Sequence, residues 1–316
     1  MASVVEALGN CKSLKTLILA RNEGIGNFDG STSRDIIFAN IKHLDLSGCG
    51  LNAKICQWLA SAVSTTTSLE LKVNSNPNLG EEATAFLMSL SLREFHASNC
   101  NINDTSLQQI VDAYSKTDTL KVLDLSHNHI TPQGVQNLAI KLLEGNGFPP
   151  SLYDLNLAGN QIGEASTQAL AKAFRVMRSQ KRLSLSKLDM TDTSCGVKGA
   201  LDLIRFSQLK SLTLFNNRMK SEGFEILATA LRGGHPTLEA LDLGGNEADE
   251  AGVVALLRPL TCKSDSFENV LRLVVVGGNA GGAAVEAVVE EIERLDPELD
   301  IARDKRKQQQ SEVGPG

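Results

Sequence analysis

Apolar side chains recur along the chain in a pattern that combines the period of a strand with that of a helix. Between Leu120 and Ile130, apolar residues stand at the first, fourth, sixth and eleventh places, and Asn128 stands at the ninth. Leu123 and Leu125 alternate, as a strand requires to place two side chains on one face. In residues 131–143 the apolar side chains fall at helical spacing. The pattern therefore predicts a short strand followed by a helix.

The same pattern repeats from end to end. The ninth place, where an amide side chain can satisfy backbone groups of the neighbouring coil, is occupied at ten positions. These are Asn22, Cys49, Asn76, Cys100, Asn128, Asn160, Leu188, Asn217, Asn246 and Asn279. The nine intervals span 257 residues, so the mean repeat is between 28 and 29 residues long. A repeat of that length leaves room for an α-helix on the side opposite the strand.

Two segments resemble the ribonuclease-inhibitor type of leucine-rich repeat: Gly244–Leu257 and Asn160–Phe174. The type includes ribonuclease inhibitor, the sensor ends of NOD-like receptors, the GTPase activator of Ran, tropomodulin and the CARMIL proteins. The resemblance covers about residues 1–293 and implies an α/β fold, a right-handed solenoid curved like a horseshoe. Ten parallel strands would line its concave face, and helices would cover its convex face.

The repeats predict one solenoid over residues 1–300, in which the first and last coils are atypical. After Asn22 the first coil lacks a clear helix, so we expect a projecting loop there. Val4–Asn10 is similar to the second half of a repeat, so this helix serves as a cap or the chain is a segment of a longer protein. The tail, residues 301–316, is polar and is expected to be disordered.

Composition and charge exclude several classes. The formal net charge of −6 argues against a general nucleic-acid binder, and no apolar run is long enough to span a bilayer. The first residues lack the features of a secretory signal, and the six cysteines include no C-x-x-C pair. Scattered free thiols favour a reducing compartment, and we expect a cytoplasmic protein. Cys49 and Cys100 stand at the ninth place, where a thiol can replace the amide as a donor.

The sequence contains no constellation of catalytic residues. It has no phosphate-binding G-x-x-x-x-G-K-[ST] loop and no H-E-x-x-H zinc motif. Ser126, His127 and Cys49 carry reactive groups, but they occupy turn positions of the repeat and no third group orients them. We therefore predict a protein without enzymatic activity, cofactor or metal site.

The second place of each repeat is strongly basic. It reads Lys15, Lys42, Leu69, Arg93, Lys121, Tyr153, Lys181, Lys210, Glu239 and Arg272. Parallel strands bring equivalent places within about 4.8 Å, where like charges repel. Two interpretations remain open: an exposed place that tolerates Lys in any solenoid, or a docking edge for an acidic partner.

The other exposed places add mixed polar chemistry in the middle coils and glycines near the end. His96, Asp124, His127 and Tyr153 fall on adjacent strands, a combination able to make charged and aromatic contacts. Near the end, Gly244–Gly245 and Gly277–Gly278 predict a flat surface. The predicted protein-binding residues are Lys42, Asp45, Arg93, His96, Lys121, Asp124, His127, Tyr153, Asn156, Lys181, Lys210 and Phe215.

Three functions remain open. The variable concave face favours a protein-interaction scaffold, monomeric alone, that binds a partner protein and neither nucleic acid nor membrane. The resemblance also suggests a GTPase activator like that of Ran. In that family an Asn in a strand-end turn is catalytic, within a motif like Leu-His-Asn-Asn. Here Leu214-Phe-Asn216-Asn217 matches the motif best, but in the coil where the resemblance places the catalytic Asn, this chain has His127. The third is a cytoskeletal regulator of the CARMIL or tropomodulin sort.

Overall fold

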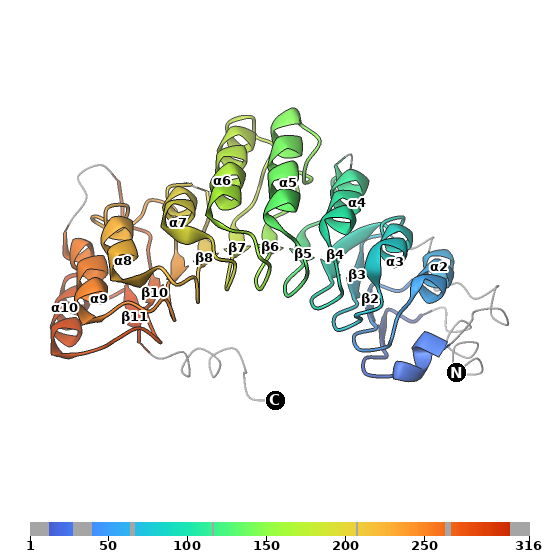
Figure 1. The fold of residues 1–316 in the computed structure, drawn as a ribbon, viewed down its shortest axis with the longest axis horizontal. Coiled ribbons are helices and arrows are strands. Elements are labelled where there is room, and N and C mark those ends of the chain that lie inside the picture. Colours follow the sequence, from blue (N-terminus) through green and yellow to red (C-terminus); the bar gives the residue numbers. More distant parts are fainter. Residues whose placement is uncertain are drawn as a thin grey trace. The chain divides into compact units, whose positions relative to one another are not determined.

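The computed structural model describes residues 13–27, 40–63, 67–115, 117–206, 208–262 and 267–303. The chain divides into two compact units. Unit 1 comprises Met1–Asn160 with Val176–Ser184, and unit 2 comprises Gln161–Arg175 with Leu185–Gly316. Within each unit, strands alternate with helices along the chain, and the helices lie on one side of the strands (Figure 1).

Unit 1 contains six parallel strands whose order in space follows their order in the chain. Its strands are β1 (Thr16–Ile18), β2 (His43–Asp45), β3 (Leu69–Lys72), β4 (Leu92–His96), β5 (Val122–Asp124) and β6 (Asp154–Asn156). Its helices are η1 (Glu23–Asn27), α2 (Ala53–Ala62), α3 (Gly80–Leu87), α4 (Asp104–Tyr114) and α5 (Pro132–Glu144).

Unit 2 has the same alternation, with five parallel strands. Its strands are β7 (Lys187–Asp189), β8 (Ser211–Thr213), β9 (Ala240–Asp242), β10 (Leu273–Val275) and β11 (Asp300–Ala302). Its helices are α7 (Gly196–Ile204), α8 (Lys220–Ala228), α9 (Glu250–Leu257), η2 (Arg258–Thr261) and α10 (Ala283–Leu295). The division between the units passes through α6 (Glu164–Ser179). In the part of the chain that the structure describes, no helix combines the length and apolar character needed to cross a membrane.

The core of each unit forms from the repeated apolar places. In β5, Leu123 pairs in register with Phe95 of β4 and Leu155 of β6, and all three side chains are fully buried. Because strands in register stack equivalent places, the fourth and sixth places form continuous apolar rows. Helices cover these rows with their own apolar faces, as α5 does with Val135, Leu138 and Leu142.

Helix α5 illustrates how local sequence sets the ends of a helix. The Thr131 hydroxyl accepts a hydrogen bond from the Gln133 amide at 3.2 Å, and Pro132 occupies the first turn, where its missing N–H costs nothing. At the other end Gly145 has φ 92°, a left-handed conformation that terminates the helix. The helix predicted after Thr131 is therefore confirmed.

Asparagines at the ninth place connect successive coils through buried hydrogen bonds. The Asn128 amide donates to the carbonyl oxygens of Ala97, Leu125 and Ser126, at 2.8 to 3.0 Å. Its Oδ1 accepts from the backbone N–H groups of Cys100 at 2.9 Å and Ile102 at 3.0 Å. One side chain thus satisfies five backbone groups.

The expected structural role of two thiols is confirmed. Cys49 Sγ donates to the Leu19 carbonyl at 3.0 Å, and Cys100 Sγ donates to the Val73 carbonyl at 2.9 Å. Each bond is the counterpart of the one from Asn128 to Ala97. Burial raises the pKa of Cys100 to about 11, which keeps its sulfur protonated as a donor at neutral pH.

The structure corrects the predicted register of the seventh coil. We expected Leu188 at its ninth place, but β7 pairs Leu188 with Leu212 of β8, so Leu188 is the buried fourth-place residue. Thr193 takes the ninth place: its hydroxyl donates to the Met190 carbonyl at 2.8 Å, and its backbone N–H donates to Asn217 Oδ1 at 3.2 Å. The repeats on either side are therefore 33 and 24 residues long, in place of 28 and 29.

The structure also contains one strand more than the ten that the sequence predicted. β11 pairs in register with β10 and continues into Ile301 and Ala302, which we had assigned to the tail. Several predicted features lie outside the described residues: the helix at Val4–Asn10, most of the first-coil loop and the remainder of the tail.

Candidate functional site

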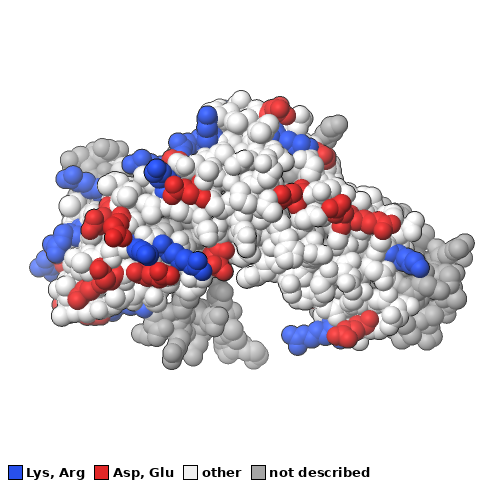
Figure 2. All heavy atoms as spheres, viewed as in Figure 1, with Lys and Arg blue, Asp and Glu red and all other residues white. Residues whose placement is uncertain are grey.

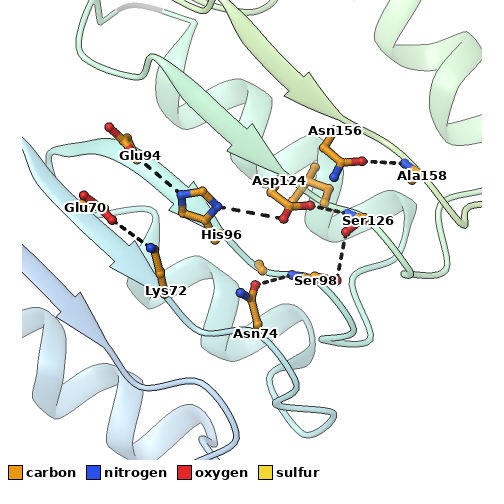
Figure 3. Close-up of polar contacts among 12 residues, drawn as sticks. Glu70, Lys72, Asn74, Glu94, His96, Ser98, Asp124, Ser126, Asn156 and Ala158 are labelled. Atoms are coloured by element: carbon orange, nitrogen blue, oxygen red, sulfur yellow. Dashed lines mark hydrogen bonds and ion pairs between the residues drawn. The ribbon is translucent and has the colours of Figure 1, made fainter. Parts of the chain in front are cut away.

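The surface of unit 1 that faces away from the helices carries a group of charged side chains. We call this surface the strand face; it consists of the second, third, fifth and eighth places on strands β2 to β6 and the turns after them, where most side chains are half-buried or exposed and Leu69 is buried. At the third and fifth places these residues are His43, Asp45, Glu70, Lys72, Glu94, His96, Val122, Asp124, Asp154 and Asn156. They project from neighbouring strands, and Figure 3 shows several of them in contact.

Glu70 on β3 lies at the centre of a chain of ion pairs. Its Oε1 is 3.1 Å from Lys72 Nζ, and its Oε2 is 2.5 Å from His43 Nδ1 and 3.6 Å from an Arg93 guanidinium nitrogen. The same guanidinium nitrogen lies 2.8 Å from Glu94 Oε1. Partial burial works to raise the pKa of Glu70, but hydrogen bonds from Lys72 and His43 outweigh it, and the pKa lies below its ordinary value. Glu70 is therefore ionised at neutral pH.

His96 on β4 lies between two carboxylates (Figure 3). Its Nε2 is 3.7 Å from Glu94 Oε2, and its Nδ1 is 3.9 Å from Asp124 Oδ2 on β5. Beyond Asp124, the Ser126 hydroxyl donates to the Ser98 hydroxyl at 2.9 Å. The network therefore extends across β3, β4 and β5.

Several fifth-place residues have a structural role that the sequence did not reveal. Asp45, Asp124 and Asn156 each accept a hydrogen bond, at 2.9 to 3.0 Å, from the backbone N–H two residues later. Asp189 and Asp242 do the same in unit 2 at 2.8 Å. This bond holds the chain as it leaves the strand. Burial works to raise the pKa of Asp124, but the imidazole of His96, 3.9 Å away, and hydrogen bonding from Ser126 outweigh it and hold the pKa below its usual range.

Eighth-place residues share a left-handed backbone conformation. The φ angle is 53° at His127, 56° at Asn216 and between 50° and 77° at eight further positions. Those positions are Arg21, Gly48, Ser75, Asn99, Gly159, Asp192, Gly245 and Gly278. Glycine and asparagine adopt this conformation at least cost. The turn therefore gives Asn216 a backbone role, and it assigns Asp192 to the eighth place in the corrected register.

The predicted basic edge is partly neutralised by neighbouring groups. Lys42 donates to the Thr67 carbonyl at 2.9 Å, Arg93 pairs with two glutamates, and in unit 2 Lys210 lies 2.8 Å from Glu239 Oε1. Lys181 is not on a strand at all; it occupies the turn after α6, with φ 57°, and Ser186 takes the second place of that coil. Lys181 therefore does not belong to the basic second-place row. On the viewed face, Figure 2 likewise shows acidic and basic side chains interspersed.

Two aromatic residues predicted to contact a partner have different surroundings. Tyr153 precedes β6 and is 38% exposed. Phe215, in unit 2, covers the glycines of the next coil: a Cβ on Gly244 or Gly245 would lie 2.9 or 2.8 Å from its ring. The flat surface predicted at Gly244–Gly245 is thus partly occupied by the chain's own side chain.

The sequence reading overlooked Glu70, Lys72 and Glu94, which form most of the ion pairs. Glu70 and Glu94 stand at the third place of their repeats, and Lys72 stands at the fifth. The third-place row contains His43, Glu70 and Glu94 on three successive strands, so the signal was present.

Comparisons with known proteins identify the repeats. Two family models match, Leucine Rich repeat over residues 118–139 and Leucine Rich Repeat over residues 40–62. The chain is 26% identical over 311 residues to NACHT, LRR and PYD domains-containing protein 5 of Homo sapiens, covering 94% of this chain and 25% of that protein. It is 28% identical over 225 residues to ribonuclease inhibitor of Mus musculus, covering 60% of this chain and 49% of that protein.

A solved structure, Leiomodin-1 Actin-Binding Site 2 (ABS2), aligns with a TM-score of 0.32 and 21% identity over 39% of this chain and 68% of that one. The chain spans between a quarter and a half of the length of the two curated relatives above.

Proposed function

Because this chain is a leucine-rich-repeat protein of the ribonuclease-inhibitor type, we propose that it binds a partner protein through the strand face of unit 1. The observation that carries the proposal is the network of acidic and basic side chains on β3, β4 and β5. Folding explains the apolar rows, the ninth-place asparagines and the fifth-place acceptors. It does not require Glu70, Lys72, Glu94 and Arg93 on a solvent-facing surface.

The chemistry of the face indicates the kind of surface that it would bind. Carboxylates and cationic groups alternate, as in the contacts of Glu70 with Lys72 and Arg93. We therefore propose a partner that presents both signs of charge, in place of the acidic partner that was one of the two interpretations of the basic second place. Tyr153 and Lys121, both exposed beside β5 and β6, extend the face; an aromatic side chain there can bury apolar area at little cost in conformational entropy.

The sequence relatives support a binding role. One of them is named ribonuclease inhibitor, a name that describes binding to another protein. No observation of this chain favours the GTPase-activator alternative, since the left-handed turn accounts for Asn216.

The test is charge reversal on the strand face, measured with a purified partner. Crosslinking in lysate followed by mass spectrometry identifies the partner, and calorimetry then measures its affinity for the double variant Lys72→Glu/Lys121→Glu. We expect affinity to fall at least tenfold, about 1.4 kcal/mol, because like charges brought together across an interface repel. Tyr153→Ala should weaken binding by a similar factor if it is an anchor.

Lys54→Glu provides the matched control. Lys54 is exposed on α2, on the helix side of unit 1, so its reversal should leave affinity unchanged. Equal losses in Lys54→Glu and in the strand-face variants would contradict the proposal, as would an affinity that none of the variants changes.

A further inference from the structure

Three metal-ligating side chains converge on the strand face of unit 1. Glu70, Glu94 and His96 each offer one donor atom, and these atoms lie within 4.8 Å of one another. Among the described residues, this is the group of His, Cys, Asp and Glu side chains that meets the spacing for a shared ion. Glu70 comes from β3, and the other two come from the neighbouring strand β4.

The contact between Glu94 and His96 has the spacing of two ligands on one ion. Their Oε2 and Nε2 atoms are 3.7 Å apart, which is longer than a hydrogen bond of about 2.7–3.2 Å. Two ligands at about 2.0–2.2 Å from a tetrahedral Zn²⁺ are about 3.4 Å apart. A small side-chain adjustment would therefore place both atoms around a single ion.

The other imidazole nitrogen faces a carboxylate, which is how protein metal sites orient their histidines. His96 Nδ1 lies 3.9 Å from Asp124 Oδ2. Asp124 is itself held in place, because its Oδ1 accepts from the Ser126 backbone N–H at 3.0 Å. The 3.9 Å separation is longer than a hydrogen bond, but a small side-chain adjustment would bring Asp124 Oδ2 within reach of an Nδ1–H group, and a carboxylate bonded there selects the tautomer that leaves Nε2 free to bind a metal. This arrangement is independent of the spacing between the three ligands.

We propose that Glu70, Glu94 and His96 bind one Zn²⁺ ion, with Asp124 orienting the imidazole of His96. One nitrogen and two carboxylate oxygens form a ligand set that Zn²⁺ accepts, and the solvent-facing side leaves a fourth position for water or for a group of another molecule. The inference does not rest on the proposed protein-binding function, and the two are tested by separate experiments.

Arg93 provides a distinguishing feature of this site. Its guanidinium nitrogen lies 2.8 Å from Glu94 and 3.6 Å from Glu70, so it neutralises the two carboxylates that the ion would bind. A bound Zn²⁺ must compete with this cation for the same carboxylates, and at Glu70 also with Lys72 and His43. Removing the guanidinium should therefore strengthen zinc binding, whereas nonspecific binding to surface carboxylates would not respond to it in this way.

The experiment is titration of the full chain with Zn²⁺ by calorimetry, together with the visible absorption spectrum of the Co²⁺-loaded protein. We expect one ion per chain and at least tenfold weaker binding in each of Glu94→Gln, Glu70→Gln and His96→Ala. Asp124→Asn should weaken binding by about 10- to 100-fold. The Asp124→Asn variant should keep the strand-end hydrogen bond to the backbone, because an asparagine, Asn156, makes that bond in the next coil. Arg93→Ala should bind Zn²⁺ more tightly than the unaltered chain.

His129→Ala is the matched control, because His129 is an exposed histidine of the same unit outside this group of residues. It should leave zinc affinity unchanged, and circular dichroism should confirm that every variant folds. The inference is overturned if Zn²⁺ shows no saturable binding, if Glu94→Gln and His96→Ala retain full affinity, or if His129→Ala alone abolishes it.

Discussion

Replacing Asn128 with Ala is expected to lower the free energy of unfolding by about 3–5 kcal/mol, the sum of several unsatisfied groups at about 1–3 kcal/mol each. The side chain is 6% exposed and makes five hydrogen bonds to backbone groups of its own coil and the preceding one. Alanine can neither donate to the carbonyls of Ala97 and Leu125 nor accept from the N–H groups of Cys100 and Ile102. These groups are buried, so water cannot replace the lost partners without opening the coil.

Urea unfolding followed by circular dichroism measures this loss of stability. Two further variants serve as an intermediate case and as a control. Asn128→Cys should lose less than Asn128→Ala, because a thiol at this place keeps one donated bond, as Cys49 and Cys100 show. Asn137→Ala, on the exposed side of α5, should change stability by no more than about 0.5 kcal/mol. If Asn128→Ala loses no more stability than Asn137→Ala, the ninth-place hydrogen bonds between coils are not a source of stability.

Replacing His235 with Ala is expected to lower the free energy of unfolding by about 2–4 kcal/mol, again from unsatisfied buried groups. His235 is 4% exposed and lies between α8 and β9 in unit 2. Its Nε2 donates to the Ile204 carbonyl at the end of α7, at 2.9 Å. Its Nδ1 accepts from the N–H groups of Thr237 at 3.2 Å and Leu238 at 2.8 Å. The neutral imidazole is the form that satisfies all three contacts.

The same residue should make stability depend on pH. Burial lowers the pKa of His235 below its ordinary value of 6.5, and the hydrogen bond to Ile204 opposes this only in part. The unfolded chain therefore binds a proton near pH 6.5, while the folded chain binds it only at lower pH. The contribution of His235 is complete above pH 6.5 and is lost as pH falls toward the folded pKa, at no more than about 1.4 kcal/mol per pH unit.

Urea unfolding at a series of pH values between 5 and 8 tests this prediction. The dependence below pH 6.5 should be smaller in His235→Ala than in the unaltered chain. His129→Ala removes an exposed histidine, and its stability should fall below pH 6.5 as steeply as that of the unaltered chain. A His235→Ala chain whose stability falls with pH as steeply as that of the unaltered chain would show that His235 is not the titrating group.

The seventh coil shows where reading the sequence fails and why. Leu183 and Leu185 alternate as a strand would, and so do Leu188 and Met190. The first pair gives repeats of 28 and 29 residues, but α6 continues to Ser179 and the strand begins only at Lys187. Helix length decides where the next strand starts, and local alternation cannot distinguish two candidate strands a few residues apart. The error moved Lys181 onto a face that it does not occupy.

Alternating leucines and a polar residue at the ninth place were enough to predict strands, helices and the thiol donors Cys49 and Cys100. Those features depend on spacing within one repeat, which the sequence states directly. The contacts of Glu70 with His43 and Arg93, and of His96 with Asp124, depend on register between strands in which Glu70 and His96 are paired with residues 24 to 28 positions away. His235 depends on a carbonyl 31 residues away. Only the packed tertiary structure decides which of these side chains meet, because each meeting requires two coils to be in register.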